Sequence, residues 1–254
     1  MELNLQEVAK IMDVDEEMLP LLPKIKFEGN MLNPWAKELP DIFKEINISK
    51  DKTVLDLPCG QGGVSVYLAK EYGVAITGYD LFEGFVDNAN EYAREENVSD
   101  RCHYFVDDIR NVIKIDKEYD LLLWIAVPHT WDNYKETIEN LRKCVKNSGN
   151  IVIADAYLYD SESKNVLPDY ETLDETLKGV TEHGDKVIKL IDYKENLWTK
   201  NYKTDREAVV KAINDADNQL EKEALEKYLN HLNESEAFDI KHLGLYIMVL
   251  EIIK

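Results

Sequence analysis

The chain has 254 residues, of which 44% are hydrophobic and 31% charged, so it can bury a large core and does not resemble a disordered tail. Asp and Glu number 50 against 30 Lys and Arg, which gives a formal net charge of −20. That is the wrong sign for a protein that binds nucleic acid or anionic lipid. The 3 cysteines lie far apart without CxxC spacing, which favours a reducing cytoplasm over a disulfide framework or a zinc site.

The first twenty residues are acidic and have no basic flank ahead of an apolar stretch, so we expect no targeting peptide. The longest apolar run, residues 121–128, is too short to span a bilayer. We therefore expect a soluble cytoplasmic protein without a membrane or nucleic-acid partner. Residues 1–50 contain a short amphipathic pattern followed by four prolines, at positions 20, 23, 34 and 40. Because proline ends helices, this part predicts short helices that form an N-terminal lid or flank.

From Thr53 onward, predicted strands alternate with predicted helices. Such alternation is typical of a parallel sheet covered on both faces by helices. The segment Tyr119 to Ala126 is apolar enough for a central strand that is buried on both faces. The expected strands are 53–57, 74–79, 102–106, 119–126 and 150–156, and the expected helices are 63–72, 83–97 and 131–145.

Residues 161–235 leave this pattern and predict an inserted, mainly helical cap. We expect a hairpin over 187–202, a helix that begins at a capping box of Thr204 and Glu207, and a charged helix over 215–232. Residues 236–254 then predict two paired strands, 238–243 and 246–253, joined by a turn at Gly244. The predicted organisation is a flank at 1–50, a core at 51–160, a cap at 161–235 and a strand pair at 236–254 that completes the core sheet.

The most informative stretch is VLDLPCGQGG at 54–63, in which a strand ends in Asp56 and a tight glycine loop leads into a helix. Such loops bring the backbone close to a ligand. A dinucleotide site needs a third glycine, but the third position counted from Gly60 and Gly62 is Ser65, which weakens the NAD interpretation. A carboxylate at Asp56 would repel a pyrophosphate but could pair with an ammonium group. A sulfonium amino acid fits this loop better.

Four segments follow one another in a familiar order: VLDLPCGQGG, GYDLFEGFVDNA, FVDDIRN and YDLLLWIAVPH. Together they resemble the motif set of class I S-adenosylmethionine-dependent methyltransferases. The resemblance covers about residues 51–160 and the final strands. It implies an α/β, Rossmann-like, doubly wound sheet of seven strands, mostly parallel with an antiparallel last strand. It also implies that the cofactor is S-adenosylmethionine, which leaves as S-adenosylhomocysteine.

The resemblance implies a set of cofactor contacts at matching positions. Asp56, Gly60 and Gly62 would lie under the methionine moiety, and Asp80, followed by Leu81, would accept the two ribose hydroxyls. The remaining contacts are Asp108 to the adenine amino group, Ile109 beside the ring, and the carbonyls of Trp124 and Ile125 at the methionine end. Pro58 stands where the family usually has its first loop glycine, so this position has no N–H to donate.

The acceptor side is less clearly marked. His129, directly after the fourth strand, is the candidate general base, although a histidine that begins a helix is often only a cap. Trp131, Tyr157 and Tyr159 follow strand ends and can form a wall of the substrate site or simply pack. Trp35 is a candidate lid residue over the cofactor. The other histidines are scattered without the spacing of metal ligands, so we expect no metal site.

We therefore expect a methyltransferase that acts on a small-molecule acceptor by in-line transfer. The alternatives are a non-catalytic cofactor-binding or partner-binding protein on the same fold, a protein methyltransferase, and a nicotinamide oxidoreductase. An extended cap favours a small enclosed substrate over a polymer. The motifs contain no signal for the identity of the acceptor, its reacting atom or the oligomeric state.

Overall fold

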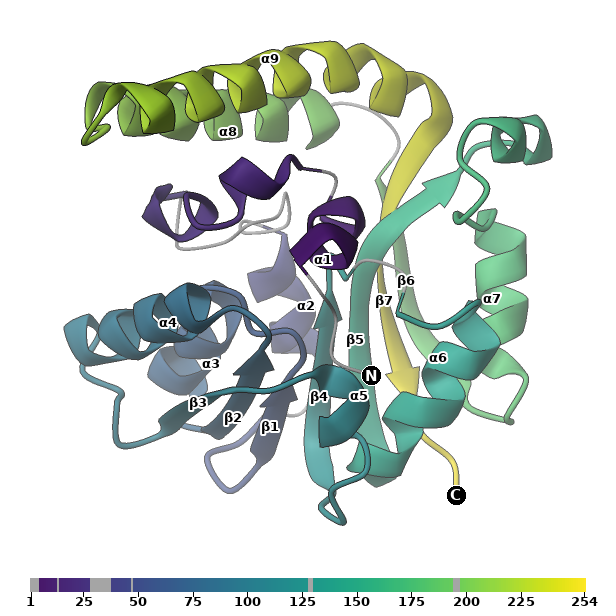
Figure 1. Cartoon of the computed structure of the whole chain (residues 1–254). Helices are drawn as coiled ribbons and strands as arrows, with labels where there is room; N and C mark the ends of the chain where they lie inside the picture. Colours follow the sequence, from purple (N-terminus) through teal and green to yellow (C-terminus); the bar gives the residue numbers. More distant parts are fainter. Residues whose placement is uncertain (1–4, 13, 28–37, 47, 128–129, 194–196) are drawn as a thin grey trace.

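A sheet of seven strands in the order β3-β2-β1-β4-β5-β7-β6 forms the centre of the protein. The computed structural model (Figure 1) describes residues 5–12, 14–27, 38–46, 48–127, 130–193 and 197–254. Strand β7 runs antiparallel to β5 and β6, and the other neighbouring strands are parallel. This is the expected Rossmann-like fold class. The strands are β1 Thr53–Asp56, β2 Ala75–Asp80, β3 Cys102–Val106, β4 Tyr119–Ile125, β5 Val145–Leu158, β6 Lys186–Tyr193 and β7 Leu243–Glu251.

Side chains alternate between the two faces of the sheet, as strand geometry requires. In β4, Leu121 and Leu123 belong to one hydrophobic core, and Leu122 and Trp124 belong to the core on the opposite face. Helices α2, α3 and α4 cover the first face, and α5, α6 and α7 cover the second. The helices are α1 Leu5–Ile11, α2 Leu39–Glu45, α3 Gly63–Tyr72, α4 Glu83–Glu95, α5 Ile109–Val112, α6 Tyr134–Leu141, α7 Leu173–Thr181, α8 Leu197–Asn214 and α9 Gln219–His242, with 3₁₀ turns η1 Glu16–Met18, η2 Leu22–Lys24, η4 Arg142–Cys144 and η5 Ser161–Asn165.

Helices α8 and α9 form a pair that lies across the carboxyl ends of the strands, and the N-terminal segment lies between this pair and the rest of the domain (Figure 1). A third hydrophobic core joins them: Val8, Leu22 and Ile25 pack with Val209 of α8 and Leu225 of α9. The N-terminal flank and the helical cap are therefore one layer. Among the described helices, none combines the length and the apolar composition needed to cross a membrane.

The sixth strand and the end of the chain differ from the prediction. Strand β6, Lys186–Tyr193, pairs along β7 and belongs to the core sheet, although it lies within the segment expected to be inserted. Residues 238–242 form the last turn of α9 instead of a strand, and β7 begins at Leu243. The alternating Phe238 and Ile240 suggested a strand, but both are exposed on the helix, at 39% and 40%. The expected pair of strands over 236–254 is thus wrong, and a single strand stands there.

The cap helix α8 also starts earlier than predicted. It begins at Leu197, so Thr204 lies inside the helix and its hydroxyl donates to the carbonyl of Lys200 at 3.0 Å. The described residues of 187–202 form no hairpin, because β6 pairs with β7 and residues 197–202 belong to α8. The capping box occurs elsewhere, where Thr172 and Glu175 open α7. A Thr-x-x-Glu spacing inside a long helix therefore misled the prediction, because the spacing alone does not show where the helix begins.

Candidate functional site

The glycine loop between β1 and α3 is held from two sides. The amide of Leu57 donates to the carbonyl of Leu123 on β4 at 3.1 Å, and the amide of Cys59 donates to the carbonyl of Tyr79 on β2 at 2.8 Å. Pro58 lies between these two anchors, and the Leu57–Pro58 peptide bond is cis. The loop therefore crosses the carboxyl edge of the sheet, where ligands bind in open α/β folds.

Two glycines allow the loop to turn this tightly. Gly60 and Gly62 have φ values of 49° and 79°, in the left-handed region that side chains disfavour. At Gly62 a Cβ atom would also lie only 2.9 Å from the Cβ of Ala89 on α4. Both the backbone conformation and the close approach of α4 thus require glycine, which agrees with a loop built to present its backbone.

Asp56 and Asp80 end neighbouring strands and lie at this loop. Each is 5% exposed. The carboxylate of Asp80 accepts hydrogen bonds from the amides of Gly60 at 2.9 Å and Phe82 at 3.0 Å. Burial raises the pKa of Asp80 to about 6, although these amides oppose the shift. Burial, with the neighbouring charge of Asp80, raises the pKa of Asp56 to about 7.

The groups that surround these carboxylates indicate the kind of ligand they suit. Among the described residues, no Lys or Arg forms an ion pair with Asp56 or Asp80 or lowers the pKa of either. A buried carboxylate without a cation is costly, so a positively charged or hydroxyl-rich ligand would stabilise the site, whereas a phosphate would be repelled. A nucleoside that carries a sulfonium and an amino-acid ammonium group has this chemistry.

An apolar surface continues from Asp80. The adjacent Leu81 is 38% exposed, and Ile109 at the start of α5 is half-buried. Asp108 caps α5 and forms a two-pronged ion pair with Arg110, with Nε 3.0 Å from each carboxylate oxygen. The Arg110 guanidinium holds the pKa of Asp108 below its usual range. Asp108 therefore caps its own helix and pairs with Arg110, two contacts that the sequence did not indicate.

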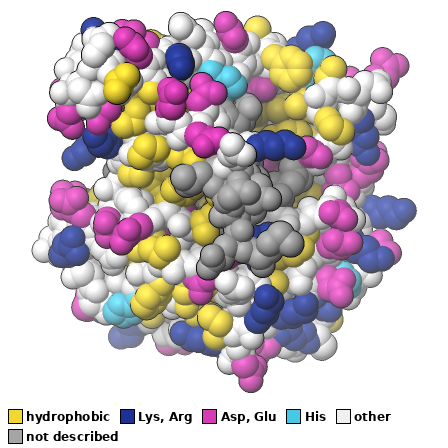
Figure 2. Space-filling model, viewed as in Figure 1, with side chains coloured by type: hydrophobic (Ala, Val, Ile, Leu, Met, Phe, Trp, Pro, Cys, Tyr) yellow, Lys and Arg dark blue, Asp and Glu magenta, His cyan; other side chains and the backbone are white. Residues whose placement is uncertain are grey.

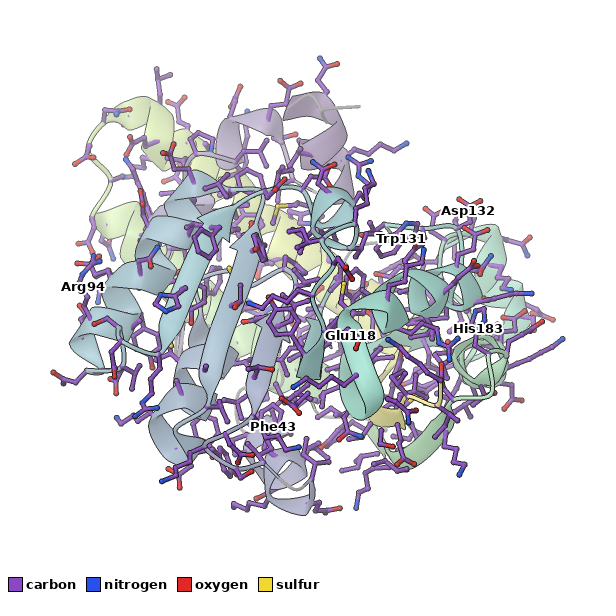
Figure 3. The ribbon with its side chains drawn as sticks, turned by 90° about the horizontal axis from the view of Figure 1, so that it is seen from below. Phe43, Arg94, Glu118, Trp131, Asp132 and His183 are labelled. Atoms are coloured by element: carbon purple, nitrogen blue, oxygen red, sulfur yellow. The ribbon has the colours of Figure 1, made fainter. Side chains whose placement is uncertain are left out.

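A strained residue follows the end of strand β4. Ala126 has a φ of 52°, a conformation that costs a non-glycine residue about 1 kcal/mol and is often found at functional sites. The rings of Trp124 and Trp131 stack with centroids 5.7 Å apart, and Ile125 is buried. In Figure 3, Trp131 and Asp132 lie together ahead of α6. The candidates His129 and Trp35 lie outside the described residues.

Tyr157 and Tyr159 lie near the end of β5. Tyr157 is buried and its hydroxyl donates to Asp192 of β6 at 2.6 Å, while Tyr159 is exposed and meets Tyr157 edge-on at 5.8 Å. Opposite Tyr157, Gly244 leaves room for the ring, because a Cβ there would lie 2.3 Å from it. The polar atom of Tyr157 is thus engaged within the sheet, and Tyr159 is the more accessible of the two.

A contact between the loop and the N-terminal segment was not predicted. The buried Gln61 donates from Nε2 to the carbonyl of Ile25 at 3.3 Å. Asn88 of α4 donates to the carbonyl of Pro23 at 2.6 Å and to Oε1 of Gln61 at 3.3 Å. Gly84 lies against Pro23, where a Cβ would come within 2.8 Å. These contacts, which we call the N-terminal latch, fasten the cap layer to the glycine loop.

The histidines that the structure describes do not gather at the site. His183, at the outer side of α6 and α7 (Figure 3), lies 3.1 Å from the carbonyl of Lys135, and His242 lies 2.9 Å from the hydroxyl of Ser163. Within the described part of the chain, no three His, Cys, Asp or Glu residues come together in a way that could hold a metal ion.

Fold and loop together define a class: an α/β domain whose glycine loop and strand-end carboxylates face a ligand at the carboxyl edge of the sheet. Residues 54–149 match a family model described as a methyltransferase domain. This segment of the chain is therefore similar to the class I S-adenosylmethionine-dependent methyltransferases, as its four motifs predicted. The matched residues run from β1 to the start of β5, so they include the glycine loop, Asp56 and Asp80 but not Tyr157 or Tyr159.

Among curated relatives, a sterol 4-C-methyltransferase of Caenorhabditis elegans is 26% identical over 58% of this chain and 44% of its own length. A ubiquinone biosynthesis O-methyltransferase of Coxiella burnetii is 28% identical over 61% of this chain and 65% of its own length. The chain thus spans less than two thirds of these relatives. A solved methyltransferase of Geobacter sulfurreducens in complex with S-adenosylhomocysteine has the same fold, with a TM-score of 0.74, 21% identity, and coverage of 88% of this chain and 94% of that one.

Proposed function

We propose that the protein transfers a methyl group from S-adenosylmethionine to a small molecule. The observation that carries the proposal is the pair of buried carboxylates, Asp56 and Asp80, beside a glycine loop in the left-handed conformation. No described cation neutralises them. A cofactor with an ammonium group and two ribose hydroxyls would supply a positive charge and further hydrogen-bond donors to these carboxylates.

Each residue of the site has a role in binding. Asp56 would pair with the ammonium group, and Asp80 would accept the ribose hydroxyls while it holds Gly60 in place. Gly60 and Gly62 would bring the loop backbone under the methionine moiety, beside Pro58. The adenine end would lie near Leu81, Asp108 and Ile109, and the carbonyls of Trp124 and Ile125 would face the methionine end.

When bound, the cofactor supplies a methyl group already activated by the sulfonium charge. The protein therefore has to align the acceptor in line with the methyl group and to exclude water. The layer formed by the N-terminal segment and α8–α9 covers the carboxyl edge of the sheet (Figure 1), which suits the exclusion of water. His129 would hold a proton of the acceptor, with Trp131, Tyr157, Tyr159 and Trp35 as walls or lid of the acceptor site.

A small acceptor is favoured over a polymer because the cap layer lies over the carboxyl edge of the sheet, where it would enclose a small molecule. The relatives named above act on a sterol and in ubiquinone biosynthesis by name, which supports the same class of acceptor. Their reacting atoms differ, carbon in one and oxygen in the other. The three cysteines are free and buried, which supports a reducing cytoplasmic location, and the charge of −20 disfavours a nucleic-acid partner.

The test is incubation of the full chain with methyl-labelled S-adenosylmethionine and fractions of small metabolites and of proteins. We expect label in the small-molecule fraction only, and Asp80→Ala should abolish it. Label in the protein fraction would indicate a protein methyltransferase. Cofactor binding without label in either fraction would favour the non-catalytic alternative.

A further inference from the structure

One stripe of the cap helix α8 connects two hydrophobic cores. Residues spaced by three or four positions share a helix face, and Leu197, Asn201, Asp205, Ala208 and Ala212 have this spacing. Leu197 packs in the core above the sheet, and Ala208 and Ala212 pack against the core of the cap. Asn201 and Asp205 therefore lie on the part of the stripe between the residues of the two cores. Helix α8 as a whole lies across the carboxyl ends of the strands (Figure 1).

Asp205 is an unusual residue for this position because the rest of the stripe is apolar apart from Asn201. It is half-buried, and its carboxylate accepts a hydrogen bond from Nδ2 of Asn201 at 3.1 Å. The following residue, Arg206, does not neutralise it by an ion pair, since its guanidinium lies 2.7 Å from Glu236 and over the ring of Tyr202. Burial raises the pKa of Asp205 to about 7. Burial of a carboxylate without a neighbouring cation costs free energy. Carboxylates held in this way are typical of ligand-binding positions.

Two aromatic rings lie beside these polar groups on the helix. The ring centroids of Trp198 and Tyr202 are 6.0 Å apart. The Trp198 Nε1 donates to the carbonyl of Leu243 at 3.0 Å, and the Tyr202 hydroxyl donates to Asp239. With their polar atoms engaged, the two rings are fixed in place. Tyr202 is buried, and the half-buried Trp198 presents apolar surface. Trp198 packs against both cores, so the aromatic surface lies where the two meet.

We propose that Asp205 and Asn201 bind the methyl acceptor, and that this acceptor is an amine with an apolar body. The inference rests on the proposed methyl-transfer function. The amine N–H groups would donate to the Asp205 carboxylate and the Asn201 carbonyl, and the apolar body would lie against Trp198. In the reaction, the lone pair of the neutral amine forms the N–C bond as the S–C bond breaks, and the positive charge moves from sulfur to nitrogen. Asp205 would then stabilise the charged product.

The negative surface charge is consistent with an amine as the acceptor but does not by itself distinguish an amine from other cations. Acidic side chains are spread over the face shown in Figure 2 instead of gathering at one place, and the net charge is −20. Such a surface attracts cations in general. The specificity is therefore assigned to the position of Asp205 between the cores and not to the net charge.

The experiment is calorimetric titration of the full chain, saturated with S-adenosylhomocysteine, with three probes of similar size: 2-phenylethylamine, 2-phenylethanol and phenylacetate. We expect the amine to bind most tightly and the acid not to bind. Asp205→Asn should weaken amine binding by about tenfold and leave the alcohol within about twofold. Glu207→Gln removes a charge from the exposed side of the same helix and should change neither the affinity for the amine nor that for the alcohol.

Equal binding of amine and acid, an unchanged amine affinity in Asp205→Asn, or no amine binding to the wild-type protein would each overturn the inference. The titration with S-adenosylhomocysteine, done first, separates this outcome from failure of the proposed function. If S-adenosylhomocysteine binds and the amine fails, only the acceptor assignment is wrong. If S-adenosylhomocysteine itself does not bind, the proposed function is wrong. Asp205→Asn conserves the shape of the side chain, and its melting temperature checks that it folds.

Discussion

The carboxylate of Asp80 accepts a hydrogen bond from the amide of Gly60 at 2.9 Å, so the residue that ends β2 also fixes the glycine loop that follows β1. This bond leaves lone pairs of the same carboxylate for a ligand, since each carboxylate can accept about four hydrogen bonds. The shape of the loop and the recognition of a ligand are therefore coupled through one side chain.

Removing that carboxylate should weaken cofactor binding more than it affects folding. We expect Asp80→Ala to raise the Kd for S-adenosylhomocysteine by about 10- to 100-fold, because hydrogen bonds to a charged group contribute about 1.5–3 kcal/mol. Calorimetry gives the Kd, and circular dichroism checks the fold. Asp87→Ala, on the exposed side of α4, is the matched control. An unchanged Kd in Asp80→Ala would show that the ribose hydroxyls bind elsewhere.

Cofactor affinity should depend on pH through Asp56. Burial raises the pKa of this carboxyl to about 7, and only its ionised form can pair with an ammonium group. The Kd for S-adenosylhomocysteine should therefore fall by roughly tenfold between about pH 6 and pH 8 as Asp56 loses its proton. Asp56→Asn should flatten this dependence. A Kd that rises with pH in the wild-type protein would contradict the assigned partner of Asp56.

The same shift predicts how folding stability changes with pH. The pKa of Asp56 is raised from 3.8 in the unfolded chain to about 7 in the fold, so between these values the native state binds more protons. The free energy of unfolding should therefore fall as pH rises from about 4 to about 7. Asp56→Asn should be more stable than wild type at pH 8, by about 2–4 kcal/mol at most, and equal to it at pH 4.

Urea denaturation of the protein without cofactor at both pH values measures this difference. Asp87→Asn serves as the exposed control and should change stability by less than about 0.5 kcal/mol at either pH. If Asp56→Asn is less stable than wild type at pH 8, the buried carboxylate has a stabilising partner in the native state, and its role as a site for a ligand cation would be wrong.

The N-terminal latch should be sensitive to Gly84. A Cβ at this position would lie 2.8 Å from Cγ of Pro23, so Gly84→Ala should push the N-terminal segment away from Gln61. We expect faster proteolysis within residues 14–27 and a Kd for S-adenosylhomocysteine raised several-fold. Glu91→Ala, an exposed change on the same helix, is the control. Unchanged proteolysis together with unchanged affinity would show that the segment does not support the loop.

Local patterns were sufficient for the first half of the sheet. The strand at Cys102–Val106 and the helix at Gly63–Tyr72 agree with the prediction residue for residue. Their hydrophobic patterns, and the glycines that bound the helix, are local signals. Asp56 was predicted from its place at a strand end and Asp80 from the resemblance to the methyltransferase family, and the structure brings both to the loop. Their burial and raised pKa values depend on the packed fold and could not be predicted from the sequence.

The cap and the sixth strand could not be predicted correctly, because they form through contacts between residues that are distant in sequence. Strand β6 contains Lys186, Lys189 and Asp192 at an edge of the sheet, so its composition resembles a surface segment, and only its pairing with β7 makes it a strand. The latch joins Gln61 to Ile25 across 36 positions. No sequence motif identifies Asp205, because its candidate role depends on its position between two hydrophobic cores that form only in the folded protein.

Calorimetric titration of the full chain with S-adenosylmethionine, S-adenosylhomocysteine and NADH under identical conditions tests the central claim most directly. We predict saturable binding of both sulfur ligands, loss of that binding in Asp80→Ala, and no binding of NADH, because its pyrophosphate would approach the carboxylates of Asp56 and Asp80. Binding of NADH, or failure of both sulfur ligands to bind the folded protein, would contradict the account.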